Sequence, residues 1–315
     1  MRWTSPFMAL ALLSPSAALA DPASPYGINT HVPSTAALNR VSEAGIGWIR
    51  VDFNWLQIEP TRDGYQWATT DRVVSDARAR GLEIYATLAY TPGWANGGQG
   101  GNVPATNPAE WADFVQDTVS RYKGSIHAWG LWNEPNLEQF FTGDVDAYID
   151  DVLRPGALAA KAADPSCAIV GPELASIGSW QRWMYVILDE AGDSIDVISH
   201  HAYEDTGSEV IRTMGGWVPF WERPQVVGIL EATGQDQKPL WLTETGWHTD
   251  EVSEDAQARY LEQVLTGMQE NSWLDKVFFY ELVDDPNITE KWGILSSDLN
   301  PKPSFYTYQG FIFGG

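Results

Sequence analysis

Eight short runs of β-branched and aromatic residues, separated by longer segments of helical period, constrain the fold of this chain more than any other feature. In the intervening segments apolar residues recur at i, i+3, i+4 and i+7, which is the spacing of an amphipathic helix. Two of these segments also begin at a capping residue, Asn107 and Ser253. The eight expected strands are Tyr26–His31, Trp48–Asn54, Leu82–Ala89, His127–Glu134, Ala168–Glu173, Asp196–Tyr203, Pro239–Glu244 and Val277–Leu282.

Eight strand–helix units without a long linker favour an α/β fold, a single (β/α)8 TIM barrel over residues 21–315. A doubly wound open sheet is the alternative. A cofactor-binding sheet of that kind would carry a glycine-rich phosphate turn after its first strand, and YGINTHVPSTAAL offers none. We therefore expect a barrel without a cofactor.

The first twenty residues predict a secretory signal peptide. They combine a basic start, the apolar run FMALALL and the small-x-small sequence ALA at positions 18–20. A buried N-terminal helix is the alternative, but the Ser14-Pro15 step would interrupt it. We expect cleavage after Ala20 and a mature chain that is periplasmic or secreted to the medium.

The charge of the chain limits its partners. With 19 basic and 42 acidic residues the formal net charge is −23, which repels nucleic acids and anionic membranes. The chain also lacks an uninterrupted apolar run long enough to cross a bilayer. We therefore expect neither a nucleic acid nor a membrane as partner, and a strongly anionic substrate is disfavoured.

Two glutamates occur where a parallel barrel collects functional groups. Glu134, in GLWNEPN, ends the fourth expected strand, and Glu244, in LWLTETGW, ends the seventh. The carboxyl ends of barrel strands point into one crevice. Glycoside hydrolysis requires two carboxylates that face each other across such a crevice. The alternative is that both glutamates are ion-paired structural residues, since a buried carboxylate must be paired.

The sequence around these glutamates resembles that of clan A glycoside hydrolases, which are retaining (β/α)8-barrel enzymes. WNEPN resembles the acid/base signature of the clan, LTETGW resembles its nucleophile signature, and the resemblance runs from about residue 26 onward. RVDFNW resembles the second-strand motif and gives Arg50 and Trp55, and HAY resembles the sixth-strand His-x-Tyr and gives His201 and Tyr203. The opening YGINTHV is similar to family 39-like or family 5-like enzymes.

The resemblance implies that Glu244 is the nucleophile and Glu134 the acid/base of a double displacement. Arg50 and Tyr203 would keep Glu244 ionised by hydrogen bonding to it, and an apolar wall containing a neighbouring tryptophan would keep Glu134 protonated. Asn133 would bind the 2-hydroxyl of the sugar.

The remaining candidates are aromatic and polar residues near the expected strand ends. Many clan members carry a tryptophan after the eighth strand, where this chain has FFYELVDD, so Tyr280 or Trp292 would take its place or the subsite is built differently. A tryptophan can pack in the core as well as against a sugar. The further candidates are His31, Trp55, Trp94 and Trp247.

A metal site is not expected, because His200 and His201 are adjacent on a strand and point to opposite faces. His201 is expected in the cleft and His200 behind the sheet. The long segment 204–221 has an aromatic tip that favours either a cleft wall or a plug on the barrel.

The sequence therefore predicts a secreted retaining glycosidase acting on a β-linked, neutral oligo- or polysaccharide, with endo action favoured by the aromatic loops. The alternatives are a carbohydrate-binding barrel without catalysis and a metal-dependent hydrolase on the same fold.

Overall fold

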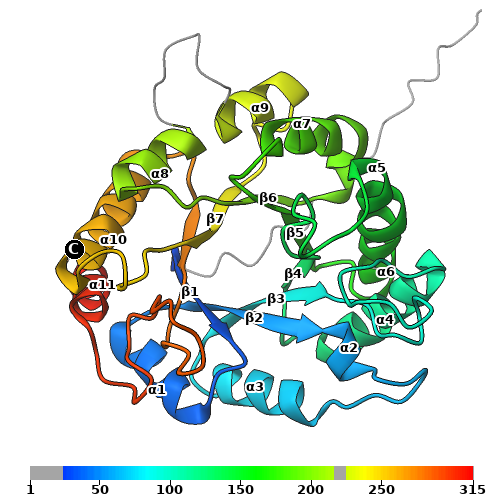
Figure 1. Ribbon diagram of the computed structural model, residues 1–315, viewed down its shortest axis with the longest axis horizontal. Helices are drawn as coiled ribbons and strands as arrows, with labels where there is room; N and C mark the ends of the chain where they lie inside the picture. Colours follow the sequence, from blue (N-terminus) through cyan, green and yellow to red (C-terminus); the bar gives the residue numbers. More distant parts are fainter. Residues whose placement is uncertain (1–23, 216–224, 315) are drawn as a thin grey trace, which may run out of the picture.

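The computed structural model describes residues 24–215 and 225–314. Eight parallel strands follow one another in chain order around a closed barrel, and the helices surround it (Figure 1). Strand β1 pairs with β8 as well as with β2, so the sheet has no edge. The predicted (β/α)8 barrel is confirmed, and the open doubly wound sheet is excluded. The predicted signal peptide and the aromatic tip of the segment 204–221 lie outside the described residues.

The elements alternate along the chain as the sequence pattern predicts. The strands are β1 (Tyr26–His31), β2 (Trp48–Asn54), β3 (Glu83–Ala89), β4 (Ala128–Leu131), β5 (Ala168–Ala175), β6 (Val197–His201), β7 (Leu240–Thr245) and β8 (Lys276–Phe279). The helices are α1 (Thr35–Ala44), α2 (Trp55–Ile58), α3 (Ala68–Arg78), α4 (Pro108–Tyr122), α5 (Val145–Ala147), α6 (Arg154–Ala163), α7 (Trp180–Ala191), α8 (Gly207–Met214), α9 (Val226–Thr233), α10 (Glu254–Glu270) and α11 (Pro303–Phe313), with a π-helical stretch at Tyr148–Leu153 and a 3₁₀ turn at Gly192–Ser194.

Local side-chain chemistry sets the starts of the helices. The side chain of Asn107 accepts a hydrogen bond from the amide of Ala109 at the start of α4, and the side chain of Ser253 accepts one from Ala256 at the start of α10. Both predicted caps are therefore confirmed, and each satisfies an amide that has no partner within its own helix. Among the described residues, no helix combines the length and apolar character needed to cross a membrane.

An aromatic plug fills the barrel below the strand ends. Its residues come from seven of the eight strands, so they can meet only inside the barrel; they are Trp48, Tyr85, Ala128, Ala168, Val170, Val197, Trp241 and Phe278. The rings of Trp48 and Trp241 lie 5.4 Å apart, and those of Tyr85 and Phe278 lie 5.7 Å apart. A second, larger layer of apolar side chains packs between the sheet and the helices. The plug forms a rigid floor for any site at the carboxyl ends of the strands.

Strand β4 is shorter than predicted. It ends at Leu131 instead of Glu134, because the chain leaves the sheet through two residues with left-handed backbone angles, Trp132 at φ 86° and Glu134 at φ 45°. Few residues with a Cβ adopt such angles, and they cluster at functional sites. Glu134 therefore lies on the turn after the strand.

Candidate active site

Two bulges aim carboxylates into the crevice above the plug. The pairing register of β5 with β6 shifts between Gly171 and Leu174, and that of β7 with β8 shifts between Leu242 and Thr245. A bulge inserts a residue and reverses the face to which the next side chains point. Glu173 and Glu244 lie within these shifts, and both approach the same arginine.

Arg50 is the centre of the site. It lies two residues after Trp48 on β2, so its side chain shares the inward face with the plug. Nη1 donates to Glu244 Oε1 at 2.6 Å and to Asn29 Oδ1 at 2.9 Å. Nη2 donates to Glu173 Oε2 at 2.6 Å and to Asn133 Oδ1 at 2.8 Å. One buried guanidinium therefore holds two carboxylates and two amides in fixed positions.

Glu244 receives donors on both oxygens. Arg50 contacts Oε1, and the hydroxyl of Tyr203 donates to Oε2 at 2.6 Å. Burial and the charge of Glu244 raise the pKa of Tyr203 well above its usual value, so the hydroxyl keeps its hydrogen and donates. These two donors fix the orientation of the Glu244 carboxylate.

His201 connects Glu134 with Glu173 and Glu244. Its Nδ1 lies 2.9 Å from Glu134 Oε1 and 3.6 Å from Glu244 Oε2, and its Nε2 lies 3.1 Å from Glu173 Oε2. Burial lowers the pKa of this histidine, but the charges of Glu244 and Glu173 and the hydrogen bonds to Glu134 and Glu173 outweigh burial and raise it to about 10. His201 is therefore a cation at neutral pH, with a hydrogen on each nitrogen.

The carboxylates of Glu134 and Glu244 lie close together. One oxygen of each and one ring nitrogen of His201 lie within 4.8 Å of one another. Both glutamates are buried but keep a small exposed fraction, 8% for Glu134 and 7% for Glu244. They are thus accessible from the crevice while their partners lie behind them.

A second charged group lies at the rim. His31 ends β1 with φ 50°, and its Nδ1 lies 2.8 Å from Asp52 Oδ2 while its Nε2 lies 2.9 Å from Glu281 Oε2. Burial opposes the charged form, but the hydrogen bonds to Asp52 and Glu281 raise the pKa of His31 to about 10. The hydroxyl of Tyr280 lies 3.2 Å from the same Nε2, so His31 and Tyr280 are neighbours as a site at the strand ends would require.

Tyr280 and Trp292 build an aromatic wall beside the nucleophile candidate. The ring of Tyr203 lies 5.5 Å from that of Trp292 and 6.3 Å from that of Tyr280, and the last two lie 5.7 Å apart. Both residues are partly exposed. The structure thus places both proposed substitutes for the missing tryptophan next to the Tyr203–Glu244 hydrogen bond.

Three candidate tryptophans make their contacts away from Glu134 and Glu244. Trp55 has no exposed surface and stacks on Phe114 at 5.3 Å in the layer between sheet and helices. Trp247 is 6% exposed, packs on Phe279 and donates its indole hydrogen to Glu204 O. Trp94 donates to Glu59 O and lies under the guanidinium of Arg62 in an acidic pocket of about 240 Å³ formed around α4. The core alternative given for these tryptophans thus fits their contacts, because an indole after a strand can turn toward the helices as easily as toward the crevice.

The apolar wall expected around Glu134 is also different from the prediction. Trp132 is buried and packs on Phe141 at 5.4 Å, and its indole hydrogen goes to Phe140 O. The nearest partner of Glu134 is instead the charged ring of His201. His200 lies behind the sheet as predicted, against Trp180 at 4.4 Å, and burial lowers its pKa to about 3.

Glu134, His201 and Glu244 are the side chains here that could hold a metal ion. A metal would have to take the place of the hydrogen on His201 Nδ1, whose pKa is raised to about 10. It would also compete with Arg50, which lies 2.6 Å from Glu244. A metal ion here would therefore have to displace both a hydrogen of His201 and the Arg50–Glu244 ion pair.

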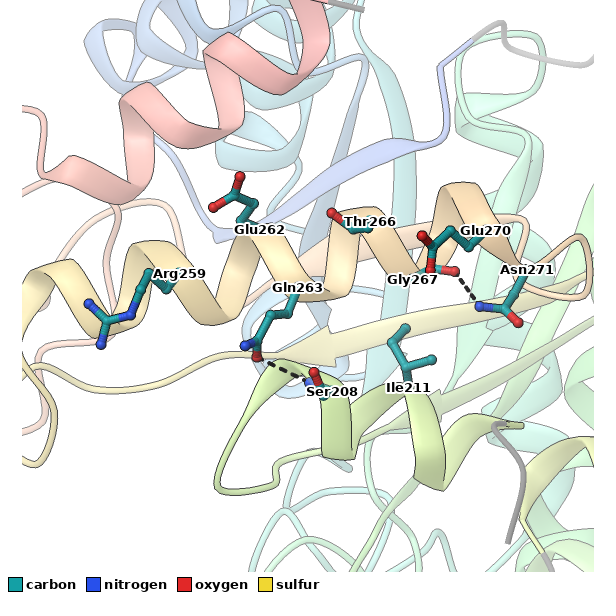
Figure 2. A pocket seen from close by; sticks show the side chains of 9 residues that line it. All are labelled: Ser208, Ile211, Arg259, Glu262, Gln263, Thr266, Gly267, Glu270 and Asn271. Atoms are coloured by element: carbon teal, nitrogen blue, oxygen red, sulfur yellow. Dashed lines mark hydrogen bonds between the residues drawn. The ribbon is translucent and has the colours of Figure 1, made fainter.

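A larger cavity of about 400 Å³ lies away from these residues. Figure 2 shows it between α8 and α10, where Ser208 contacts Gln263 and Ile211 faces α10. None of the predicted site residues lines it.

Comparison with known proteins agrees with this geometry. Residues 82–214 match the model of glycosyl hydrolases family 39. The chain resembles family 39. A β-xylosidase from Caldicellulosiruptor saccharolyticus is 26% identical over 173 residues, which cover 50% of this chain and 35% of that protein. An endo-1,4-β-xylanase from Agaricus bisporus is 27% identical over 144 residues, 42% of this chain and 40% of that protein.

Solved structures confirm the fold. A family 39 glycoside hydrolase from Bacteroides cellulosilyticus WH2 has a TM-score of 0.76 at 22% identity, over 91% of this chain and 62% of that one. A family 39 β-xylosidase from Caulobacter crescentus has a TM-score of 0.71 at 19% identity, over 90% of this chain and 70% of that one. The chain thus spans well under half of the curated relatives and about two thirds of these structures.

The family 39 match covers Asn133, Glu134, His201 and Tyr203. Arg50 and Glu244 lie outside the matched residues, and in the folded chain Arg50 hydrogen-bonds to both Glu244 and Asn133. The match also covers Glu173, which has no exposed surface and which the sequence did not single out. A signal was present, because Glu173 is a third glutamate at the end of an expected strand, in GPEL. If side chains alternated strictly along β5, Glu173 would point away from the crevice. The bulge that turns it inward cannot be read from the sequence.

Proposed function

We propose that this chain is a retaining glycosidase that cleaves β-linked oligo- or polysaccharides by double displacement. The observation that carries the proposal is the approach of Glu134 and Glu244, whose nearest oxygens lie within 4.8 Å across an accessible gap. Retaining enzymes place their carboxyl groups about 5–5.5 Å apart, and inverting enzymes need about 6.5–9.5 Å to admit water. The separation supports retention of configuration.

In the first step Glu244 attacks the anomeric carbon while Glu134 gives its proton to the leaving oxygen. Glu244 suits this role because Arg50 and Tyr203 donate to its two oxygens and fix its orientation. The bond from the sugar to the leaving oxygen breaks as the ester bond to Glu244 forms. In the second step Glu134 removes a proton from water, which attacks the same carbon and releases Glu244.

Asn133 is oriented for a hydroxyl of the substrate. Arg50 has only donors, so the atom of Asn133 that it contacts at 2.8 Å must be the oxygen. The Nδ2 group is then left to donate to a sugar hydroxyl. Tyr280 and Trp292 supply partly exposed aromatic surface on the other side of Glu244. Such surface favours the apolar faces of sugar rings.

The substrate class follows from charge and resemblance. The net charge of −23 disfavours polyanionic glycans, and the names of the relatives point to β-xylosides and β-1,4-xylan as first substrates. We further propose that the chain is exported and that it acts within polymers rather than only at their ends.

The test compares the mature chain with Glu134→Gln and Glu244→Gln on aryl β-xylosides, xylo-oligosaccharides and a panel of neutral β-glycans. Both variants should lose several orders of magnitude in kcat, and Glu254→Gln, an exposed isosteric change on α10, should lose nothing. Proton NMR should show the β-anomer as the first product. Near-normal turnover in either variant, or a first-formed α-anomer, would refute the assignment.

The same experiment separates the alternatives. Sugar binding without new reducing ends would support a carbohydrate-binding barrel. Activity that disappears with EDTA and returns with zinc would support a metal-dependent hydrolase using Glu134, His201 and Glu244.

A further inference from the structure

We propose that Glu173 is a positioning residue of this site, whose carboxylate holds Arg50 and His201 from behind so that each presents its other nitrogen to a catalytic glutamate. The proposal rests on the function proposed above. Glu173 has no exposed surface, so it cannot touch a substrate and must act through its neighbours.

Both oxygens of Glu173 accept hydrogen bonds. Oε2 accepts from Arg50 Nη2 at 2.6 Å and from His201 Nε2 at 3.1 Å, and Oε1 accepts from Thr243 Oγ1 at 2.8 Å. The backbone amide of Glu173 donates to Ser199 Oγ at 3.1 Å, which fixes the bulge that carries it. Burial raises the pKa of Glu173, but the charges of Arg50 and His201 hold it well below its usual value. Glu173 is therefore a permanent anion.

Glu173 contacts Arg50 and His201 in the same way. Arg50 uses Nη2 for Glu173 and Nη1 for Glu244, while His201 uses Nε2 for Glu173 and Nδ1 for Glu134. Glu244 thus contacts Arg50 and Glu134 contacts His201, and the buried carboxylate of Glu173 holds the other side of both cations. A shift of that carboxylate would displace both partners together.

The contact with His201 decides which atom of Glu134 carries the proton. His201 Nδ1 has a hydrogen and lies 2.9 Å from Glu134 Oε1, so Oε1 is an acceptor. The proton needed for the leaving oxygen must then be on Oε2. With a neutral His201, Nδ1 could instead accept that proton and keep it from the glycosidic oxygen. The ionisable and charged groups around His201 are Arg50, Glu134, Glu173, His200, Tyr203 and Glu244.

Glu173 should therefore set the alkaline limit of activity. In the state that can act as an acid, the carboxyl of Glu134 is protonated and both ring nitrogens of His201 carry a hydrogen. Removal of the adjacent negative charge makes the first proton easier to lose, whichever residue loses it. The isosteric change Glu173→Gln removes the charge and keeps most of the volume.

The first experiment measures kcat and KM of Glu173→Gln on an aryl β-xyloside between pH 4 and 9. We expect kcat to fall at least about tenfold, KM to change little, and the alkaline limb of kcat/KM to move to lower pH by about one unit. The matched control is Asp164→Asn, which removes a buried carboxylate near the opposite end of β5 and should leave the shape of the profile unchanged. An unshifted alkaline limb in Glu173→Gln would overturn the proposal.

A second measurement does not depend on the folding of that variant or on turnover. In the wild-type protein labelled with ¹⁵N-histidine, both ring nitrogens of His201 should carry hydrogens at pH 8 without substrate. Its signals are identified by their loss in His201→Gln. A neutral His201 at pH 8 would refute the proposal even if the enzyme is a glycosidase, and failure of Glu244→Gln to lose activity would refute the glycosidase assignment alone.

Discussion

Replacement of Arg50 by methionine tests whether the charge network stabilises the fold as well as the site. Arg50 is 4% exposed and donates to Glu173 and Glu244 at 2.6 Å each. Removing one partner of a buried ion pair leaves a charge without compensation, which costs about 3–5 kcal/mol. For a domain of this size that corresponds to a fall in Tm of roughly 6–10 °C at pH 7.

The loss should depend on pH with a defined sign. In the wild type the pKa of Glu173 is depressed, so its contribution to stability is present above the unfolded value of about 4.3 and disappears as pH falls through the folded value. In Arg50→Met, Glu173 loses one of its two cations and keeps only His201, so burial raises the pKa of this carboxyl above its wild-type value. The variant can then relieve its cost by binding a proton, so its deficit in unfolding free energy should shrink between pH 7.5 and pH 5.

Urea denaturation followed by tryptophan fluorescence at these two pH values measures the effect. The control is Arg78→Met, which breaks a half-exposed pair with Glu83 at 2.6 Å and should cost at most about 1 kcal/mol. The reasoning fails if Arg50→Met is no worse than this control at pH 7.5, or if its deficit is the same at both pH values.

Three further substitutions separate site residues from core residues. Tyr203→Phe removes the hydroxyl that donates to Glu244 at 2.6 Å, and kcat should fall about 10- to 100-fold with an unchanged circular dichroism spectrum, because a hydrogen bond to a charged group contributes about 1.5–3 kcal/mol. Trp55→Phe should lower the unfolding free energy by about 1–3 kcal/mol and leave KM unchanged, because the residue is buried away from the crevice; a raised KM at wild-type stability would show that it binds substrate after all. His31→Asn should destabilise the protein more at pH 6 than at pH 10.5. The raised pKa of about 10 means that protonated His31 contributes to stability fully below about pH 6.5 and that this contribution is lost as pH rises through 10. Equal losses of unfolding free energy in denaturant titrations at both pH values would contradict the ion pairs at the rim.

Periodicity predicted the barrel because each strand and helix is encoded locally. The expected and observed bounds of β1 and β2 are identical, and six other strands differ by a few residues at their ends. Asn107 and Ser253 could be assigned as caps because the capping side chain acts on its own helix. The largest errors, three residues each, are at the ends of β4 and β8. At β4 the backbone adopts left-handed angles at Trp132 and Glu134, and no propensity favours those angles there.

Site residues could be predicted where their position at a strand end was enough to identify them. They could not be predicted where the direction of the side chain decides its contacts. Glu134 and Glu244 follow from position and motif, whereas the indoles of Trp55, Trp94 and Trp247 turn away from the crevice. Glu173 depends on a register shift that forms only when β5 pairs with β6. Tertiary pairing, rather than local sequence, determines which face such a residue occupies.

The hydrogen bonds of the cluster distinguish its three glutamates from one another. Three carboxylates, Glu134, Glu173 and Glu244, meet two cations, Arg50 and His201, so the buried group is neutral when one carboxylate is protonated. Glu173 accepts from three side-chain donors and Glu244 from Arg50 and Tyr203, whereas the described residues give Glu134 a single close donor, His201. The proposed acid needs an oxygen that is free to face the leaving group, and Glu134 is the glutamate of the three with the fewest donors. The unequal distribution of hydrogen bonds among like residues, rather than the apolar wall that the sequence suggested, thus distinguishes the proposed acid from the other two.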